Sequence, residues 1–217
     1  MDFSTVLFDL DGTLVDSISL ILDSYRYALG QMGIEADDRE ILNTIGIPLK
    51  EACLGFAGDR SEELLNCYVE YQDTIHDQHI KEYAGTTSLF ENLTGQGYRI
   101  GIVTSKRRPM AKRGLKVAGL DKYVDVLVAF EDTVAHKPDP EPVQKALQFL
   151  CASPAKSIYV GDSLYDIRSG KNAGVATAGV VWGVSSEEDL VREAPDVIVR
   201  NWDDLLIFLE GAGYIRK

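Results

Sequence analysis

The chain of 217 residues is 45% hydrophobic and 26% charged, and 34 acidic against 22 basic residues give it a net charge of −12 at pH 7. These values are typical of a folded globular protein and exclude a disordered or fibrous chain. The acidic balance also argues against a nucleic-acid-binding protein, because such proteins use basic side chains to displace counterions from phosphate.

The sequence indicates neither a membrane protein nor a secreted one. Its longest nearly apolar stretch, residues 173–184, is shorter than the roughly 20 residues that cross a bilayer. No basic segment precedes an apolar one at the N-terminus, so we expect no secretory signal. The three cysteines are scattered and odd in number, which favours buried, reduced thiols in a cytoplasmic protein: Cys53, Cys67 and Cys151.

Apolar runs rich in β-branched residues recur along the chain, separated by amphipathic stretches of helical length. Strands are predicted over residues 5–8, 99–103, 124–129, 157–160, 176–182 and 197–199. Helices are predicted between most of them, over residues 86–93, 109–118 and 140–150. This alternation is typical of an α/β fold with a parallel sheet and helices on its faces. Gly119 and Gly174 each follow an Ala at the end of a helical stretch, where a left-handed C-cap is expected.

Residues 15–83 interrupt the alternation, because they contain no convincing strand. Helices are predicted there over residues 17–32, 38–45, 49–57 and 61–80. The segment is too long for a crossover connection, and its 14 acidic and 5 basic residues set it apart from the nearly neutral remainder. We therefore predict a core domain of residues 1–14 and 84–217, with a helical cap domain of residues 15–83 inserted after the first strand.

Two of the predicted strands end in carboxylates. Asp9 and Asp11 follow the first strand two positions apart, so both side chains can point the same way. Asp162 follows the strand at residues 157–160, and Asp166 comes four residues later, one turn along a helix that would begin at Ser163. Open α/β sheets bind ligands at the carboxyl ends of their strands, which is where these four acids would meet.

Such a cluster requires a compensating cation. Two carboxylates about 4 Å apart repel by about 4 kcal/mol at an effective dielectric constant of 20. Ligands that are all oxygen select a hard ion, and Mg²⁺ is the usual partner of carboxylates that also handle phosphate. Thr104, Ser105 and Lys106 end another core strand, and Lys137 lies in a proline-rich segment; these groups could bind an anion beside the acids.

Taken together, these residues give a sequence that resembles the haloacid dehalogenase superfamily, in the phosphatase branch with a helical cap after the first motif. The resemblance covers nearly the whole chain and implies a doubly wound, mainly parallel Rossmann-like core. It rests on four motifs in order: Asp9-Leu10-Asp11-Gly12-Thr13, Thr104 or its neighbour Ser105, Lys137, and Gly161-Asp162 with Asp166. Within that branch the chain is most similar to the phosphoglycolate phosphatases. Residues 137–142 and 161–166, with His76-Asp77, are especially similar to the bacterial inorganic pyrophosphatases of that group.

The resemblance implies a role for each site residue. Asp9 would attack phosphorus and form an aspartyl-phosphate, and Asp11 would protonate the leaving oxygen and then activate water. Thr104 and Lys137 would stabilise the phosphoryl oxygens, with Ser105 and Lys106 as further phosphate contacts. Mg²⁺ would be bound by Asp9, the backbone carbonyl of Asp11, Asp162 and Asp166, the last either directly or through water.

The implied activity is Mg²⁺-dependent hydrolysis of a small phosphomonoester such as phosphoglycolate, or alternatively of pyrophosphate. A sugar phosphomutase is a weaker alternative, because members of that kind use a cap histidine where residues 17–22 contain none. A dehalogenase would lack an acid at the position of Asp11. The sequence leaves open the physiological substrate, the cap residues that select it, although the turn at residues 46–50 is a candidate, and the oligomeric state.

Overall fold

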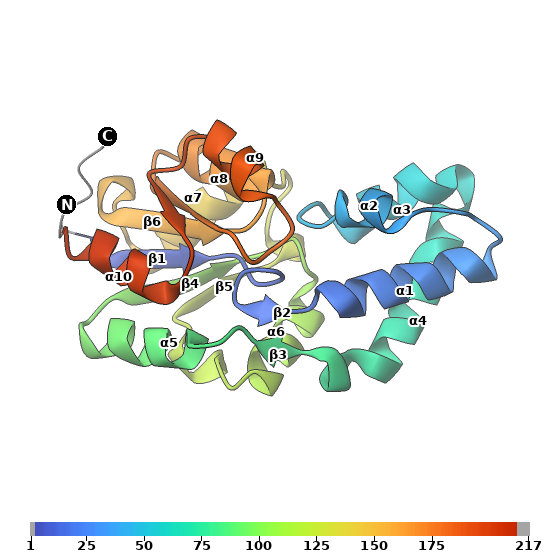
Figure 1. The fold of residues 1–217 in the computed structure, drawn as a ribbon, viewed down its shortest axis with the longest axis horizontal. Coiled ribbons are helices and arrows are strands. Elements are labelled where there is room, and N and C mark those ends of the chain that lie inside the picture. Colours follow the sequence, from blue (N-terminus) through green and yellow to red (C-terminus); the bar gives the residue numbers. More distant parts are fainter. Residues whose placement is uncertain (1–2, 212–217) are drawn as a thin grey trace.

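The computed structural model describes residues 3–211 (Figure 1); residues 212–217 of the predicted core domain lie outside this range. Its main sheet has six strands in the order β5-β4-β1-β6-β7-β8, and every neighbouring pair is parallel. The predicted α/β class with a mainly parallel, Rossmann-like sheet is confirmed. The strands are β1 (Thr5–Phe8), β4 (Arg99–Val103), β5 (Val126–Val128), β6 (Ser157–Gly161), β7 (Ala176–Val180) and β8 (Val197–Val199).

Helices cover both faces of the sheet because side chains along its strands alternate (Figure 1). Leu7 of β1 packs on the side of α7 and α8, whereas Val6 and Phe8 pack on the side of α5, α6 and α10. Core helices and 3₁₀ turns follow in chain order: α5 (Thr86–Gly95), α6 (Arg108–Val117), α7 (Glu141–Leu150), α8 (Leu164–Asn172), α9 (Glu187–Arg192), α10 (Trp202–Leu209), and turns at Asp121–Tyr123, Phe130–Asp132 and Pro154–Lys156.

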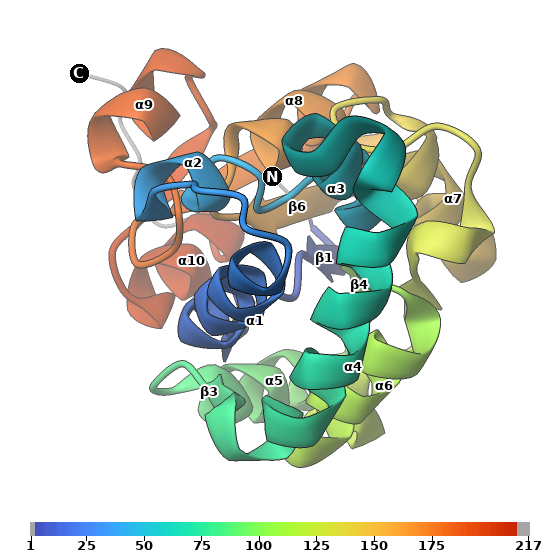
Figure 2. The same cartoon turned by 90° about the vertical axis from the view of Figure 1, so that its right-hand side faces the viewer.

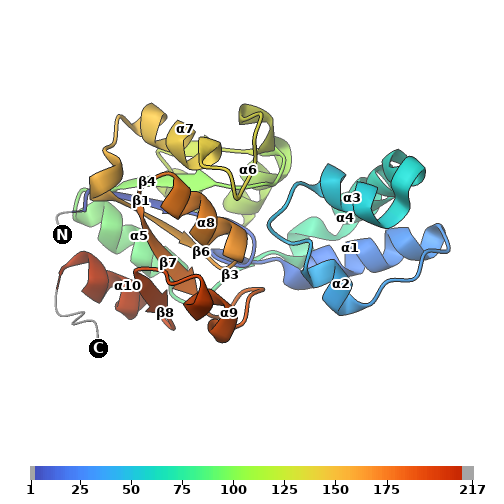
Figure 3. The ribbon, with the colours of Figure 1, turned by 90° about the horizontal axis from the view of Figure 1, so that it is seen from above.

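Four further helices form a separate body beyond the carboxyl ends of the strands (Figures 1 and 3). They are α1 (Ile18–Gln31), α2 (Asp38–Leu42), α3 (Leu49–Ala57) and α4 (Ser61–His79), with a 3₁₀ turn at Gly58–Arg60 between the last two. This body has its own apolar core, in which the rings of Tyr25 and Tyr68 lie 4.7 Å apart between α1 and α4. Seen from the cap end, α4 runs beside α6 of the core (Figure 2).

A two-stranded ribbon connects the two bodies. β2 (Val15–Asp16) pairs antiparallel with β3 (Lys81–Glu82), with Val15 opposite Glu82. The expectation that residues 15–83 contain no strand is therefore wrong, since a strand of two residues is too short to show an alternating pattern. We propose that this ribbon is the joint between a core domain of residues 1–14 and 84–217 and a cap domain of residues 15–83.

Some predicted element bounds differ from those observed. β7 ends at Val180, two residues before the predicted end, because the chain leaves the sheet and Val184 N–H donates to Asp162 Oδ2 at 2.8 Å. Gly119 and Gly174 have φ of +70° and +77°, which confirms the left-handed helix ends. All three cysteines are free thiols, but only Cys53 is buried: Cys67 is half-buried and Cys151 is exposed at the C-cap of α7, so the expectation that all three are buried is wrong for these two. Within residues 3–211, no helix has the length and apolar character needed to cross a membrane.

Candidate active site

The site is assembled by the register of three neighbouring strands. Phe8, the last residue of β1, lies opposite Ile102 of β4 and Val160 of β6, and Asp9 N–H donates to Val160 O at 2.9 Å. Asp9 therefore leaves the sheet at the same edge as the segments that follow β4 and β6. Thr104 and Asp162 lie at this edge because they directly follow the last residues of β4 and β6.

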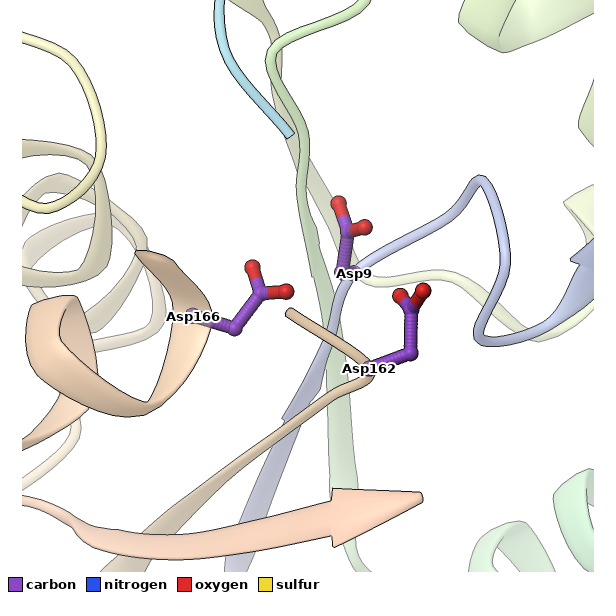
Figure 4. Close-up of side chains that lie close together, drawn as sticks. All are labelled: Asp9, Asp162 and Asp166. Carbon is purple, nitrogen blue, oxygen red and sulfur yellow. The ribbon is translucent and has the colours of Figure 1, made fainter. Parts of the chain in front are cut away.

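Three carboxylates from two segments of the chain, after β1 and at the junction of β6 and α8, converge at this edge (Figure 4). Each of Asp9, Asp162 and Asp166 offers an oxygen that lies within 4.8 Å of the other two. All three side chains are buried, with residue exposures of 4%, 1% and 0%. Buried acids in such a group need a compensating positive charge.

Lys137 supplies one positive charge. Its Nζ donates to Asp9 Oδ1 at 2.9 Å and to Asp166 Oδ1 at 2.7 Å. Burial disfavours the ammonium, but the attraction of Asp166 and Asp9 outweighs this effect and raises the pKa of Lys137. The lysine is thus a fixed cation, and three carboxylates against one ammonium still leave the cluster negative when all are ionised.

The carboxylate of Asp166 is fully engaged by protein donors. Besides Lys137, Tyr159 Oη donates to its Oδ1 at 2.9 Å, and Ser163 donates to its Oδ2 from the backbone N at 3.0 Å and from Oγ at 2.5 Å. Ser163 and Asp166 thereby form the capping box of α8. The predicted meeting of Asp166 with the other acids is found, but its main contact is with Lys137.

The pKa values of Asp9 and Asp162 are both raised. Burial and repulsion from Asp166 raise the pKa of Asp162 to about 7, although Thr13 Oγ1 and Val184 N–H each donate to it at 2.8 Å. Burial also raises the pKa of Asp9 well above its usual range, because Lys137 offsets the penalty only in part. A hard cation beside these oxygens would reverse both shifts.

Two glycines make room for the acidic side chains. A Cβ added at Gly12 would lie 2.4 Å from Asp162 Oδ2, and Gly12 has a φ of +81° that disfavours other residues. A Cβ added at Gly161 would lie 2.3 Å from the Cβ of Asp166. The Asp-Gly and Gly-Asp pairs of the sequence therefore serve close packing at the site.

Comparison with known proteins agrees with this geometry. The family described as haloacid dehalogenase-like hydrolase matches residues 6–180. The chain belongs to the haloacid dehalogenase-like hydrolases. It is 38% identical to pyrophosphatase PpaX of Bacillus mycoides and 39% identical to that of Bacillus anthracis, in each case over 96% of this chain and at least 97% of the relative.

Solved structures of this hydrolase family share the fold. A protein from Bacteroides fragilis, provisionally named a haloacid dehalogenase-like hydrolase, superposes with a TM-score of 0.87 at 30% identity, over 94% of this chain and 99% of its own. A Lactobacillus plantarum protein, provisionally named a phosphoglycolate phosphatase, gives 0.85 at 27% identity, over 95% and 99%. Both likenesses include the cap region as well as the sheet.

The second aspartate of the hydrolase motif makes different contacts from the first. Asp11 Oδ1 accepts from Lys106 Nζ at 2.7 Å and from Ser17 Oγ at 2.6 Å. Burial raises the pKa of Asp11, but attraction and hydrogen bonding from Lys106, together with Ser17, outweigh burial, so the pKa is lowered. The pKa of Asp11 is thus shifted in the opposite direction from those of Asp9 and Asp162, which burial raises.

The hydroxyls that follow β4 take two different positions. Thr104 is buried at the sheet edge, and its Oγ1 accepts from Lys106 N–H at 3.2 Å. Ser105 Oγ instead donates to the carbonyl of Gly46 in the cap at 2.7 Å. The cap turn that includes Gly46 is thus bound to the core next to the site.

The cap and core enclose a chamber above the acids. It has about 1010 Å³ of empty space including its open mouth, and its floor includes all six of these predicted residues: Asp9, Asp11, Thr104, Ser105, Lys106 and Lys137. Asp162 and Asp166 lie behind this floor, beside Asp9. The predicted candidates therefore gather at one site, in a floor layer and a supporting layer.

Sequence reasoning missed several supporting groups. Thr13 and Ser17 orient Asp162 and Asp11, Tyr159 holds Asp166, and Trp182 Nε1 donates to the carbonyl of Thr13 at 3.1 Å. Ser163, which also holds Asp166, is the predicted start of a helix with an acid three residues later, a spacing typical of a capping box. The others depend on contacts between distant segments.

Proposed function

We propose that this hydrolase is a Mg²⁺-dependent phosphatase that hydrolyses small phosphomonoesters through an aspartyl-phosphate on Asp9. The observation that carries the proposal is that only one of the two oxygens of the Asp9 carboxylate is hydrogen-bonded within the described part of the chain. Lys137 holds its Oδ1, no donor within residues 3–211 bonds to Oδ2, and Asp9 lines the chamber floor. A carboxylate oxygen that is fixed in direction but free to react is what nucleophilic catalysis requires.

The chemical steps use residues already at the floor. Asp9 Oδ2 attacks phosphorus, the bond to the leaving oxygen breaks, and Asp11 gives that oxygen a proton. Water then attacks the aspartyl-phosphate, Asp11 takes its proton, and phosphate and free Asp9 are released. Lys137 and Thr104 stabilise charge on the phosphoryl oxygens, and Ser105 and Lys106 are additional contacts for the phosphate.

The donor set fits Mg²⁺. The ligand groups are all oxygen and are buried, and burial together with repulsion between the carboxylates raises the pKa of Asp9 and Asp162. Asp9, Asp162 and the backbone carbonyl of Asp11 would bind it. Because four hydrogen bonds already occupy the carboxylate of Asp166, we favour the alternative in which Asp166 binds the ion through a water molecule rather than directly. When bound, Mg²⁺ neutralises charge on the phosphoryl group and keeps Asp9 ionised.

Pyrophosphate is a second candidate substrate. The relatives in Bacillus mycoides and Bacillus anthracis are both named pyrophosphatase, and they align over nearly the full length of this chain. The same nucleophile would serve, with phosphate as the leaving group.

The test is phosphate release from phenyl phosphate by the purified protein. We expect turnover with Mg²⁺, none with EDTA, and loss of turnover in Asp9→Asn. Asp121→Asn, at an exposed position of a core turn, is the matched control and should retain full activity. Mass spectrometry of the acid-quenched enzyme should place a phosphoryl group on the peptide containing Asp9. Turnover that persists in EDTA or in Asp9→Asn would contradict the proposal.

A further inference from the structure

The floor and the roof of the chamber differ in chemical character. The floor is charged and polar, as described above. The roof is formed by the cap, and most of its lining side chains are aliphatic: Ile21, Ile45, Ile47, Leu49, Leu65 and Val69. The leaving group of a phosphate ester that reacts with Asp9 therefore faces a largely apolar surface.

The polar side chains of the roof mostly bond to one another or to the cap backbone. Gln72 Nε2 donates to Tyr68 Oη at 2.7 Å, and Thr44 Oγ1 donates to the carbonyl of Ile41 at 2.7 Å. Burial raises the pKa of both Tyr25 and Tyr68, so neither phenol becomes charged. Apart from Lys50, the cap residues that line the chamber within residues 3–211 therefore carry no charge.

The cations that line the chamber are nearly all paired. Lys137 is bonded to Asp9 and Asp166, and Lys106 is bonded to Asp11. Lys50 lies at the rim, where its Nζ is 3.1 Å from Glu62 and its side chain is 69% exposed. Of the four basic side chains around the chamber, only Arg107 has no acidic partner within residues 3–211, and it is exposed at the mouth.

These features disfavour a second anionic group beneath the cap. A carboxylate or a second phosphate placed against the aliphatic side chains of the roof would lose its hydration, and the one cation without an acidic partner within residues 3–211, Arg107, lies exposed at the mouth. An apolar group in the same place would gain from the removal of its surface from water. The distribution of charge therefore favours an uncharged leaving group.

We propose that the preferred substrates are phosphomonoesters of uncharged, largely apolar alcohols, whose apolar part packs under the cap against Ile47, Leu65 and Val69. The proposal rests on the proposed phosphatase function and makes it more specific. Phosphoglycolate and pyrophosphate, whose leaving groups are charged, are then expected to be poor substrates.

The test compares leaving groups of similar chemical reactivity. Methyl, ethyl, n-propyl and n-butyl phosphate have alkoxide leaving groups of similar basicity, so differences in kcat/KM report contacts with the chain. We expect kcat/KM to rise by up to about fourfold for each added methylene, the value for full burial of a methylene. Pyrophosphate and phosphoglycolate should have lower kcat/KM than n-butyl phosphate.

A substitution in the roof distinguishes a contact between the alkyl chain and the cap from a general loss of activity. Val69→Thr keeps the side-chain shape but adds a hydroxyl, so it should lower kcat/KM for n-butyl phosphate more than for methyl phosphate and thereby flatten the dependence on chain length. Val191→Thr is the matched control, because Val191 lies on α9 outside the chamber and is 53% exposed. In the control, kcat/KM should rise with alkyl chain length as steeply as in the unsubstituted enzyme.

Each outcome is decisive. A rising series that Val69→Thr flattens supports the proposal. Efficient hydrolysis of pyrophosphate or phosphoglycolate, with no dependence on alkyl length, would overturn the apolar leaving group and leave the hydrolase mechanism standing. Absence of phosphate release from every compound would overturn the phosphatase function, and this inference with it.

Discussion

Lys106 Nζ lies 2.7 Å from Asp11 Oδ1, so the residue proposed as general acid is held in an ion pair above the chamber floor. The two side chains are 11% and 14% exposed. The ammonium keeps Asp11 ionised, and an ionised carboxylate has no proton to give. An incoming phosphate competes for the same ammonium, and its binding would free Asp11 to take up a proton. Lys106 therefore links substrate binding to the state of the acid.

Replacing Lys106 should therefore weaken catalysis through substrate binding. In Lys106→Met we expect kcat/KM for phenyl phosphate to fall about 10- to 100-fold, the range for a lost hydrogen bond to a charged group. Most of the loss should be a higher KM. Lys112→Met, at an exposed position of the helix α6 that follows Lys106, is the control. Unchanged KM in Lys106→Met would exclude the phosphate contact.

Lys137 has a structural role as well as a chemical one, because it is the only basic side chain bonded to the acidic cluster within residues 3–211. Lys137→Met would leave Asp9 and Asp166 buried without their partner. We expect the free energy of unfolding to fall by about 3–5 kcal/mol, together with loss of phosphatase activity. Urea unfolding measures the first and phosphate release the second. Unfolding at the same urea concentration as the unsubstituted protein would show that the buried pairs are energetically unimportant.

Mg²⁺ should stabilise the protein in a pH-dependent way. Because the folded-state pKa of Asp162 is raised to about 7, its contribution to stability is fully present below the unfolded-state pKa and is lost as pH rises through about 7. Mg²⁺ would bind the ionised carboxylate of Asp162 and so offset this loss of stability. We expect Mg²⁺ to raise the Tm more at about pH 8 than at about pH 5.5.

Scanning calorimetry with Mg²⁺ or EDTA at the two pH values measures this difference. Asp162→Asn is the informative variant, since its neutral amide should raise the Tm of the metal-free protein at the higher pH and reduce the effect of Mg²⁺. An equal Mg²⁺ effect at both pH values would argue against a cation at this carboxylate.

The sheet and the acids at its edge could be predicted because they follow from short-range rules. An apolar run that ends in Asp9 or Asp162 fixes a strand end, and parallel strands bring their ends together. The capping spacing of Ser163 and Asp166 is equally local. These signals lie within a few residues of each other along the chain.

The rest of the site depends on contacts between distant segments. Ser105, a predicted phosphate contact at the chamber floor, also donates to the carbonyl of Gly46, 59 residues away, and no pattern in the sequence indicates this second partner. The partnership of Tyr159 with Asp166 depends on the packing of α8 against β6. The apolar roof could not be foreseen either, because the face that each cap helix turns toward the core is set by the joint at β2 and β3 and by the packing of α1 on α4.

His76 provides a final prediction, at the contact between the cap and the core. The side chain is completely buried at the end of α4, its Nδ1 lies 2.8 Å from Asp77 Oδ1, and its Nε2 has no hydrogen-bond partner among residues 3–211. Asp77 Oδ1 also accepts from Arg113 Nε of α6 at 2.7 Å, so the histidine lies next to an ion pair between the domains.

Burial lowers the pKa of His76, and the nearby Lys106 and Arg113 act in the same direction against the bond to Asp77. For a group with a lowered folded-state pKa, the unfolded chain binds more protons, so stability is present above about pH 6.5 and is lost as pH falls through the folded-state pKa. His76→Asn keeps a donor for Asp77 and removes the titration. We expect its unfolding free energy to fall less than that of the unsubstituted protein between about pH 7 and pH 5.

His79→Asn, one turn along the same helix, is the matched control and should retain the full pH dependence. Urea unfolding of the three proteins with Mg²⁺ present keeps the acidic cluster from contributing an opposite slope. If His76→Asn lost stability at low pH as steeply as the unsubstituted protein, the buried imidazole would not be the group that titrates. The acid sensitivity would then have to come from carboxylates such as Asp77, whose pKa is lowered by its bonds to Arg113 and His76.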